Sequence, residues 1–336
     1  MKLQRRQRGV AMLTALLIVA LAVMVVTSLF VQQRYSIRLS TNLQDMEQAY
    51  QYAYAAEKMA GAWLAQDLKE TTDGSYDSLQ DNWAAKIPVF EIDDDNGQPI
   101  GEVQVKIEDL QAYFNVNNLY DVQNKKPRAS MLKVFQQILQ TQGMLPSSFA
   151  YSVVDWIDPD DELTDPDSAE SDYYSSQDKP YQASNTLIVD TTELRILKLG
   201  NITEPEEKKK LLGELIPFIT ALPTPSALNV NTASEAMLAA IGLTSQQVQA
   251  IVQERTAAPI KSSAALTKLV QNLTAQQKVL LNVSSNYYRL TGQVRLGKSR
   301  LFINSVLFRS ADGKVSVIMR QFNRVNALPE TEPTDA

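Results

Sequence analysis

The chain has 336 residues, of which 44% are hydrophobic and 21% charged, and its formal net charge is −6. This composition allows about two domains with a substantial core and excludes a disordered or collagen-like chain. The absence of cysteine and histidine excludes disulfides, thiolate nucleophiles, Ser-His-Asp triads and imidazole metal ligands. Oxygen ligands remain, and they suit hard cations such as calcium.

The first predicted element is a membrane-spanning helix behind a basic segment. Residues 1–9 contain no acid and four basic side chains, Lys2, Arg5, Arg6 and Arg8. Residues 10–31 form an uncharged run of 22 residues, which as a helix can cross a hydrocarbon core of about 30 Å. The basic flank directs the N-terminus to the cytoplasm and the remainder outward. A cleavable secretory signal is disfavoured because no A-x-A-like site follows Val31.

The helical pattern continues into polar sequence without a loop. Apolar residues recur at intervals of three and four from Leu39 to Trp63, and no Gly or Pro interrupts residues 10–60. This spacing predicts one helix over residues 10–68, about 88 Å long at 1.5 Å per residue. Its first half is apolar on all sides, and its second half is amphipathic.

The stretch RQRGVAMLTALL resembles the leader of type IV prepilin-like proteins. The resemblance implies cleavage by a prepilin peptidase after Gly9, which leaves Val10 as a usually N-methylated first residue. Loss of the four basic side chains changes the formal net charge from −6 to −10. Such an acidic body argues against nucleic-acid binding.

One position departs from the pilin pattern. Pilins usually carry Glu at mature position 5, where this chain has Thr14. That Glu is thought to pair with the N-terminal amine of the subunit above it, and a carboxylate in lipid is costly without such a partner. Thr14 therefore fits a subunit at the tip of a filament. The alternative is an ordinary membrane helix that never carried the Glu.

Strand-like runs bounded by turn signals predict an antiparallel sheet from two distant parts of the chain, and Val103, Val105 and Ile107 alternate within one run. The expected strands are residues 87–92, 102–107, 287–296, 301–308 and 314–320. We interpret Asp93–Asp95 as part of a hairpin turn rather than as a metal site. A long helix on a small sheet is typical of the pseudopilin body, expected at residues 69–108 and 285–323. The final residues, 324–336, are expected to be disordered.

Between these strands, residues 109–284 are predicted to form a mainly helical inserted domain. The expected helices are residues 130–142, 192–199, 204–216, 234–241, 245–255 and 274–281. The landmarks of this region are FNVNNL, VVDWIDPDD, AESDYY, PYQASN, TTELRIL and LNVNTAS. In this order they resemble the K-type minor pseudopilin of the type II (general) secretion system. The predicted fold is therefore α+β, a pseudopilin fold with a large helical insertion.

The acidic segment is the main candidate site. Ten Asp and Glu residues fall between Asp155 and Asp178, with no Lys or Arg between Lys133 and Lys179. Crowded carboxylates repel one another unless a cation neutralises them or they take up protons. The spacing is not that of an EF-hand, which needs Gly where Leu163 stands. From the residues alone, a calcium loop and a solvated acidic loop both stay open.

The K-type resemblance implies bound calcium in this segment. The expected ligands are Asp158, Asp160, Glu170 and Asp172, with Asp155 and Asn185 as further candidates. The family often has Gly before Ala-Glu where this chain has Ser168, which puts the local turn in doubt. The expected role of the ion is to fold the loop rather than to catalyse a reaction.

Residues 228–255 resemble a helix-hairpin-helix, a module that binds DNA phosphates in other proteins. That use needs a Gly-Ile-Gly type hairpin and basic neighbours, whereas this unit has Gly242 followed by Leu243 and the single base Arg255. We therefore expect no nucleic-acid binding. Asn229 and Asn231 are expected to tie down the turn before a packing helix.

The resemblance implies a non-enzymatic subunit anchored once in the inner membrane, with its body in the periplasm. It would stand at the tip of the pseudopilus with I-type and J-type minor pseudopilins, above a filament of the major pseudopilin, and help to start assembly for protein export. The alternative is a minor pilin of a type IV pilus or competence system. A third hypothesis, a periplasmic glycosidase, is weakened because the acids cluster in one loop rather than across a cleft.

Overall fold

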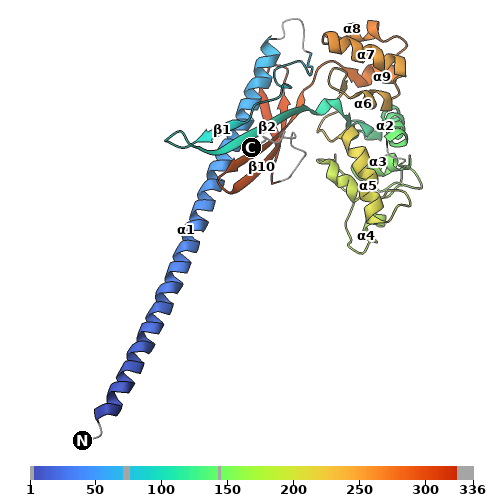
Figure 1. Ribbon diagram of the computed structural model, residues 1–336. Coiled ribbons are helices and arrows are strands. Elements are labelled where there is room, and N and C mark those ends of the chain that lie inside the picture. Colours follow the sequence, from blue (N-terminus) through green and yellow to red (C-terminus); the bar gives the residue numbers. More distant parts are fainter. Residues whose placement is uncertain (1–3, 71–75, 143–144, 324–336) are drawn as a thin grey trace.

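A computed structural model describes residues 4–70, 76–142 and 145–323. Figure 1 shows a long N-terminal helix, a sheet packed on its upper part, and a mainly helical region beyond the sheet. This arrangement confirms the predicted α+β class with a helical insertion. The tail predicted to be disordered, residues 324–336, lies outside the described residues.

Helix α1 (Gln4–Glu70) runs without a break through the apolar run and into the globular body. Residues 10–44 are exposed along their whole length. An 18-residue window near the N-terminus reaches a mean hydropathy of 2.8 with no burial, so this helix is long and apolar enough to cross a membrane. Higher up, small residues recur on one face and let the helix approach the sheet closely. They are Ala49, Ala53, Ala56 and Ala60, followed by Leu64.

The sheet has five antiparallel strands in the order β1-β2-β9-β10-β11. Their bounds are β1 (Phe90–Asp93), β2 (Pro99–Asp109), β9 (Tyr287–Leu296), β10 (Ser299–Arg309) and β11 (Val315–Phe322). All five overlap the predicted strands. The predicted hairpin is confirmed: Asp94 Oδ1 accepts from the Asn96 and Gln98 amides at 2.8 and 2.9 Å, and Gly97 adopts φ 73°.

The inserted region contains eight α-helices among the described residues. They are α2 (Ala129–Gln142), α3 (Phe149–Ile157), α4 (Ser171–Ser175), α5 (Pro205–Leu215), α6 (Glu235–Ala240), α7 (Ser245–Ala257), α8 (Ser263–Leu269) and α9 (Ala275–Leu280). Short strands pair within it: β3 (Phe114–Asn115) with β6 (Ile219–Thr220), β4 (Tyr120–Asp121) with β5 (Lys126–Pro127), and β7 (Leu228–Asn229) with β8 (Leu281–Asn282). Four 3₁₀ turns connect these elements: η1 (Leu110–Ala112), η2 (Val116–Leu119), η3 (Thr191–Arg195) and η4 (Ile216–Phe218).

Two features of this region differ from the sequence prediction. The helix expected at residues 192–199 is the 3₁₀ turn η3, closed by a capping box between Asp190 and Glu193. Helices α3, α4 and α8 were not predicted. Almost every residue of α3 is buried, so its sequence shows no polar face, while α4 and α8 are too short to display a period.

The hydrophobic residues separate into two main cores. One lies between α1 and the sheet and includes Trp83, Leu290 and Leu301. The other fills the inserted region and includes Phe114, Phe135 and Phe149. Phe114 and Phe135 stack with their ring centroids 5.6 Å apart. Each part of the molecule therefore has its own core.

A buried polar network joins the two parts where β2 ends. The Asp109 Oδ2 accepts from Asn229 Nδ2 at 3.1 Å, and from Thr232 Oγ1 and Ser285 Oγ at 2.6 Å each. Burial is the largest influence on Asp109 and raises the pKa of its carboxyl to about 6 despite these bonds. Asn229 also donates to the Asp77 carbonyl at 3.1 Å. The network thus ties the helix-hairpin-helix-like unit to the sheet, as its predicted structural role requires.

Candidate metal centre

The centre begins on α3, whose last turn carries Asp155 and whose C-cap is Asp158. The Asp158 amide donates to the Val154 carbonyl at 2.9 Å and ends the helix. Residues three apart share one side of a helix, so both carboxylates face the same volume. The helix is fixed because Val153 and Val154 are fully buried in the second core.

The third member, Glu170, comes from the loop that leads into α4. Its carbonyl accepts from the Tyr173 and Tyr174 amides at 3.0 and 3.3 Å, so its backbone position is set by α4. Tyr174 is fully buried, with its ring centroid 5.3 Å from that of Trp156 on α3 and 5.1 Å from that of Tyr181. These ring contacts bring α4 against α3 and place Glu170 beside the two aspartates.

Carboxylate oxygens of Asp155, Asp158 and Glu170 all lie within 4.8 Å of one another, and all three residues are buried. Asp155 is partly satisfied, since its Oδ1 accepts from the Thr164 amide at 3.1 Å and its Oδ2 accepts from Ser168 Oγ. By contrast, Asp158 Oδ1 and both oxygens of Glu170 have no hydrogen-bond partner among the described residues. Buried acceptors without donors are rare and point to a missing electropositive group.

The electrostatics of the three residues agree with this geometry. Burial, followed by repulsion from Asp155 and other neighbouring carboxylates, raises the pKa of Asp158 to about 7 and that of Glu170 to about 8. The pKa of Asp155 is also raised, first by burial. Within the described part of the chain, no Lys or Arg forms an ion pair with any of the three. Several oxygen ligands in a negative pocket without a counter-charge suit calcium.

The structure brings together part of the predicted ligand set. Asp160 and Asp172 are exposed and lie outside the group of three; Asp160 Oδ1 accepts from the Glu162 amide at 3.0 Å. Asn185 lies beside α3, because its amide donates to the Trp156 carbonyl at 3.0 Å. Its side-chain oxygen is buried without a hydrogen-bond partner among the described residues, as expected of a further ligand.

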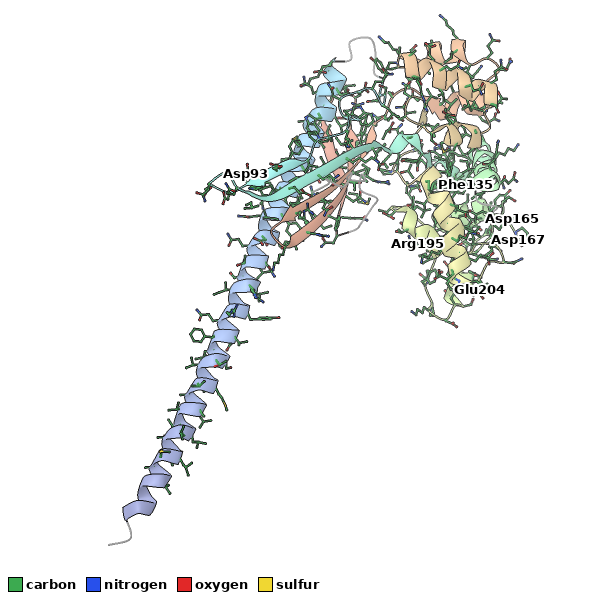
Figure 2. The ribbon with its side chains drawn as sticks, viewed as in Figure 1. Asp93, Phe135, Asp165, Asp167, Arg195 and Glu204 are labelled. Carbon is green, nitrogen blue, oxygen red and sulfur yellow. The ribbon has the colours of Figure 1, made fainter. Side chains whose placement is uncertain are left out.

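The remaining acids of the segment lie toward solvent. Figure 2 shows Asp165 and Asp167 on the outer side of the inserted region, away from the stalk. The Asp165 side chain stabilises a turn, because its Oδ1 accepts from the Asp167 amide at 2.9 Å. The structure places Asp155, which the sequence analysis gave as a further candidate, beside Asp158 and Glu170. The signal for this proximity was helix α3, which the sequence analysis did not predict.

Lys198 is a member of this environment that sequence reasoning missed. Its Nζ donates to the Ser168 carbonyl at 2.9 Å and lies 5.2 Å from the centroid of the Tyr173 ring. The ammonium group thus ties down the loop that precedes Glu170, without pairing with the three carboxylates. Its distance from the acidic segment along the sequence hid this role.

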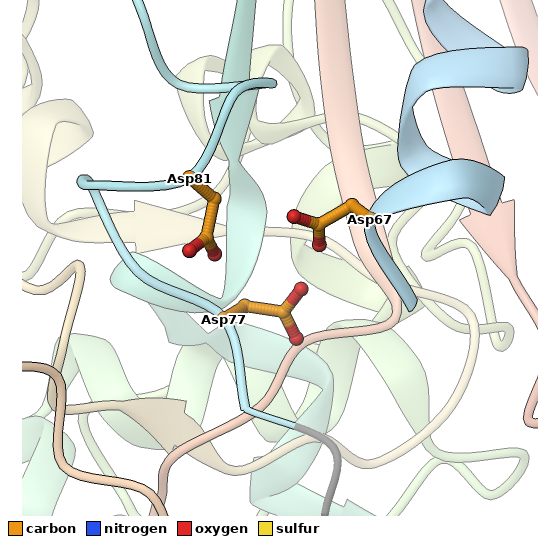
Figure 3. Close-up of side chains that lie close together, drawn as sticks. All are labelled: Asp67, Asp77 and Asp81. Atoms are coloured by element: carbon orange, nitrogen blue, oxygen red, sulfur yellow. The ribbon is translucent and has the colours of Figure 1, made fainter. Parts of the chain in front are cut away.

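A second acidic cluster lies at the top of α1, where Asp67, Asp77 and Asp81 converge from the helix and the following loop (Figure 3). Arg309 of β10 pairs with Asp67 Oδ2 at 3.2 Å and also with Asp77 Oδ1, and its side chain is almost fully buried. Asp81 accepts from the Ser78 amide at 2.7 Å. The protein therefore supplies its own cation and donors here, so this cluster is a structural ion-pair network.

The helix-hairpin-helix-like unit uses its polar groups internally. Asn231 Nδ2 donates to the Ile260 carbonyl at 3.0 Å, and Asn231 Oδ1 accepts from the Ile260 amide at the same distance. The guanidinium of Arg255 donates to the Val230 carbonyl at 2.7 Å and to the Ala233 carbonyl at 2.5 Å. Arg255, the single basic residue of this unit, thus stabilises the turn at residues 230–233.

The processing residues Gly9 and Val10 lie within α1. Cleavage between them stays a prediction.

Comparisons with known proteins agree on one family. Two family models described as "Type II secretion system (T2SS), protein K" match residues 112–224 and 228–284. Type II secretion system protein K of Pseudomonas aeruginosa is 34% identical over 330 residues, which cover 96% of this chain and 95% of the relative. The protein of the same name from Aeromonas hydrophila is 26% identical, with 95% and 98% coverage.

A solved structure is similar to most of the chain. It is a chain in the crystal structure of the GspK-GspI-GspJ complex from the enterotoxigenic Escherichia coli type 2 secretion system. The match has a TM-score of 0.67 at 22% identity and covers 85% of this chain and 99% of that chain. The two chains therefore share a fold, including the large insertion.

Proposed function

The chain belongs to the type II secretion system protein K family, and from this membership we propose that it stands at the tip of the pseudopilus and helps to start filament assembly. As a family member it is a minor pseudopilin of this secretion system. The comparisons do not favour the alternative of a type IV pilus or competence pilin.

The observation that carries the tip position is the size and placement of the inserted region. It projects sideways from the sheet at the end of α1 remote from the N-terminus (Figure 1). A filament shaft needs each subunit to pack closely against copies above and below it. A body this wide obstructs such repetition, whereas at the end of the filament nothing has to pack above it.

Thr14 supports the same position. Its hydroxyl donates to the Ala11 carbonyl within α1 at 2.9 Å, so its polar group is satisfied inside the helix. A Glu at this position would instead need a partner from a subunit above. At this position the chain therefore needs no hydrogen-bond or ion-pair partner from a neighbouring subunit.

We propose I-type and J-type minor pseudopilins as the partners of the chain. The similar solved chain belongs to a complex whose title names GspK, GspI and GspJ. Further proposed partners are the major pseudopilin filament below the tip, the prepilin peptidase and the inner membrane. The exposed apolar part of α1 is the single-pass anchor in this proposal, and the body then lies in the periplasm.

The absence of cysteine allows a direct test of the tip position. A Val279→Cys variant offers one reactive thiol on a side chain that is 75% exposed, and it can be labelled with a gold particle. Electron microscopy of assembled pseudopili is expected to show label at one end only. Label spaced along the shaft contradicts the proposal. Intact mass with and without prepilin peptidase checks removal of residues 1–9.

We further propose that the buried centre holds calcium through Asp155, Asp158 and Glu170, with Asn185 as an additional ligand. The orphaned oxygens of Asp158, Glu170 and Asn185 support this assignment. When bound, the ion supplies positive charge that lets these carboxylates stay ionised in a buried site. All three carboxylates belong to one folded segment, so we assign the ion a structural role and the chain no catalytic one.

A further inference from the structure

The face of the sheet that α1 does not cover carries a groove beneath the inserted region. A cavity of about 390 Å³ lies between strands β2, β9 and β10 below and residues 189–191 and 216–221 above. A second cavity of about 190 Å³ adjoins it toward β11. The two share Val189, Ala221, Val306 and Met319, so they form one channel across the strands, which we name the far-face groove.

The inner end of the far-face groove contains polar groups that the fold leaves unused. Asn304 is 3% exposed, lines the larger cavity, and its Oδ1 has no hydrogen-bond partner among the described residues. Thr291, its cross-strand neighbour on β9, is not a lining residue, but its buried hydroxyl also lacks a hydrogen-bond partner in the described part of the chain. A buried acceptor of this kind costs free energy unless a donor reaches it. The Asn304 oxygen can therefore accept a hydrogen bond from an N–H or O–H group of a molecule bound in the groove.

Charged side chains of both signs line the larger cavity, namely Lys106, Glu108, Asp190 and Arg289. Arg289 lines the same cavity, and none of the ion pairs between described residues includes it. Its cross-strand neighbour Glu108 pairs with Lys106 instead, at 2.6 Å. A guanidinium facing a partly enclosed space favours a carboxylate.

The outer end, at strand β11, is apolar. Ile318 and Met319 line the smaller cavity together with Leu187 and Pro223. A register shift pairs Val306 with Met319 and Leu307 with Val317, which leaves Ile318 without a cross-strand partner. Ile318 is 44% exposed and Val189, on the opposite wall, is 66% exposed. An apolar side chain can enter between these two residues.

We propose that the far-face groove docks an extended segment of a partner minor pseudopilin, with an apolar side chain between Ile318 and Val189 and a carboxylate against Arg289. Strands β11 and β9 are two strand spacings apart, or about 10 Å, which three or four extended residues span. The segment supplies the hydrogen-bond donor that Asn304 lacks.

The choice of a membrane-anchored partner follows from the small size of the groove, and it rests on the proposed function. A few residues in such a groove bind weakly on their own. A partner whose helix is anchored in the same membrane beside α1 is held at high effective concentration, so weak contacts suffice. A soluble exported protein has no such advantage.

The test compares full-length variants co-expressed in membranes with I-type and J-type minor pseudopilins. Ile318→Glu and Val189→Glu change exposed side chains in the far-face groove. Ile100→Glu is the matched control, an isoleucine that is 41% exposed on β2, beside the opposite edge of the sheet. The two groove variants are expected to capture at least one partner about tenfold less well, and Arg289→Gln about threefold less well. Ile100→Glu is expected to match the unmodified chain, and melting temperatures show that all variants fold.

Site-directed crosslinking identifies the occupant. An Ile318→Cys variant carrying benzophenone maleimide is expected to crosslink to one partner pseudopilin. Crosslinks to a second copy of this chain or to an exported protein overturn the proposal, as does full capture by both groove variants. If the unmodified chain captures neither partner, the proposed partners themselves are wrong, which is a separate result from failure of the groove.

Discussion

The two acidic clusters of this chain both bring carboxylates close together, but they differ in how the repulsion between the carboxylates is offset. Asp67 and Asp77 are neutralised by Arg309, which arrives from a strand more than 230 residues later in the chain. No arginine among the described residues pairs with Asp155, Asp158 or Glu170, and within this part of the chain buried oxygens of Asp158 and Glu170 lack hydrogen-bond donors. A cluster with its own cation is part of the fold, whereas a cluster without one depends on its surroundings. The contrast gives a criterion for separating structural acids from ligands.

The largest expected effect comes from removing the internal cation. Arg309→Met leaves Asp67 and Asp77 without their counter-charge, and we expect a loss of about 3–5 kcal/mol in the free energy of unfolding. Calcium is not expected to restore it. Urea unfolding measures the change. Arg300→Met, an exposed arginine on the same strand, is the control and is expected to stay near the unmodified chain; an equal loss in both variants contradicts this role for Arg309.

The second effect comes from removing the external cation. Calcium at a hundred times its dissociation constant is expected to add about 2.7 kcal/mol to the free energy of unfolding. Chelation removes this gain, and Glu170→Gln abolishes most of it. Thermal unfolding with and without calcium measures both. Asp172→Asn, in the same segment but exposed, is the control and is expected to keep the full calcium response. If it does not, the ligand set inferred from the sequence is the better one.

A smaller effect is expected from pH in calcium-free protein. The pKa values of Asp158, about 7, and Glu170, about 8, lie above those of free carboxyl groups. The folded state therefore binds more protons than the unfolded state between about pH 4.5 and pH 8, and stability falls as pH rises through this window. Calcium is expected to flatten the profile. Melting temperatures across this range check both statements, and stability rising with pH in the calcium-free chain would contradict them.

The smallest effect is expected at the lysine beside the metal centre. Lys198→Met removes a hydrogen bond to the Ser168 carbonyl and a cation–π contact with Tyr173. We expect a loss of about 1 kcal/mol in the free energy of unfolding, with calcium binding retained. Lys210→Met, on an exposed residue of α5, is the control. Loss of calcium binding in Lys198→Met would show that the lysine positions the ligands.

Much of the arrangement of the long helix and the sheet could be predicted from the amino-acid sequence. The strand predicted at residues 287–296, before the Gly297-Lys298 turn, is β9 at its observed bounds. The uninterrupted pattern after residue 10 predicted α1, since nothing in it ends a helix. In both cases the signal that predicts the element lies within the segment or in the residues next to it.

The candidate site was predicted less completely for physical reasons. Helix α3 is buried on nearly all sides, so no polar face marked it, and the pairing of Asp155 with Asp158 was missed. Arg309 and Asp77 are adjacent only in space, and no local pattern encodes that contact. Asn185 was predicted as a lesser ligand through resemblance, and its buried oxygen became evident only when its position beside Trp156 was known.

The exposed stretch of α1 between the apolar run and the body, residues 32–44, also sets the distance of the body from the apolar run and the direction in which the body faces. At 1.5 Å per residue it lifts the body about 20 Å above the end of the apolar run. A helix turns about 100° with each residue. One inserted residue would therefore rotate the body, with the far-face groove and the metal centre, by about 100° around the axis of α1. An insertion of seven residues would move the body about 10 Å farther from the apolar run, but the body would face within about 20° of its original direction. The number of residues in this stretch of α1 therefore determines the direction in which each surface of the body faces its neighbours.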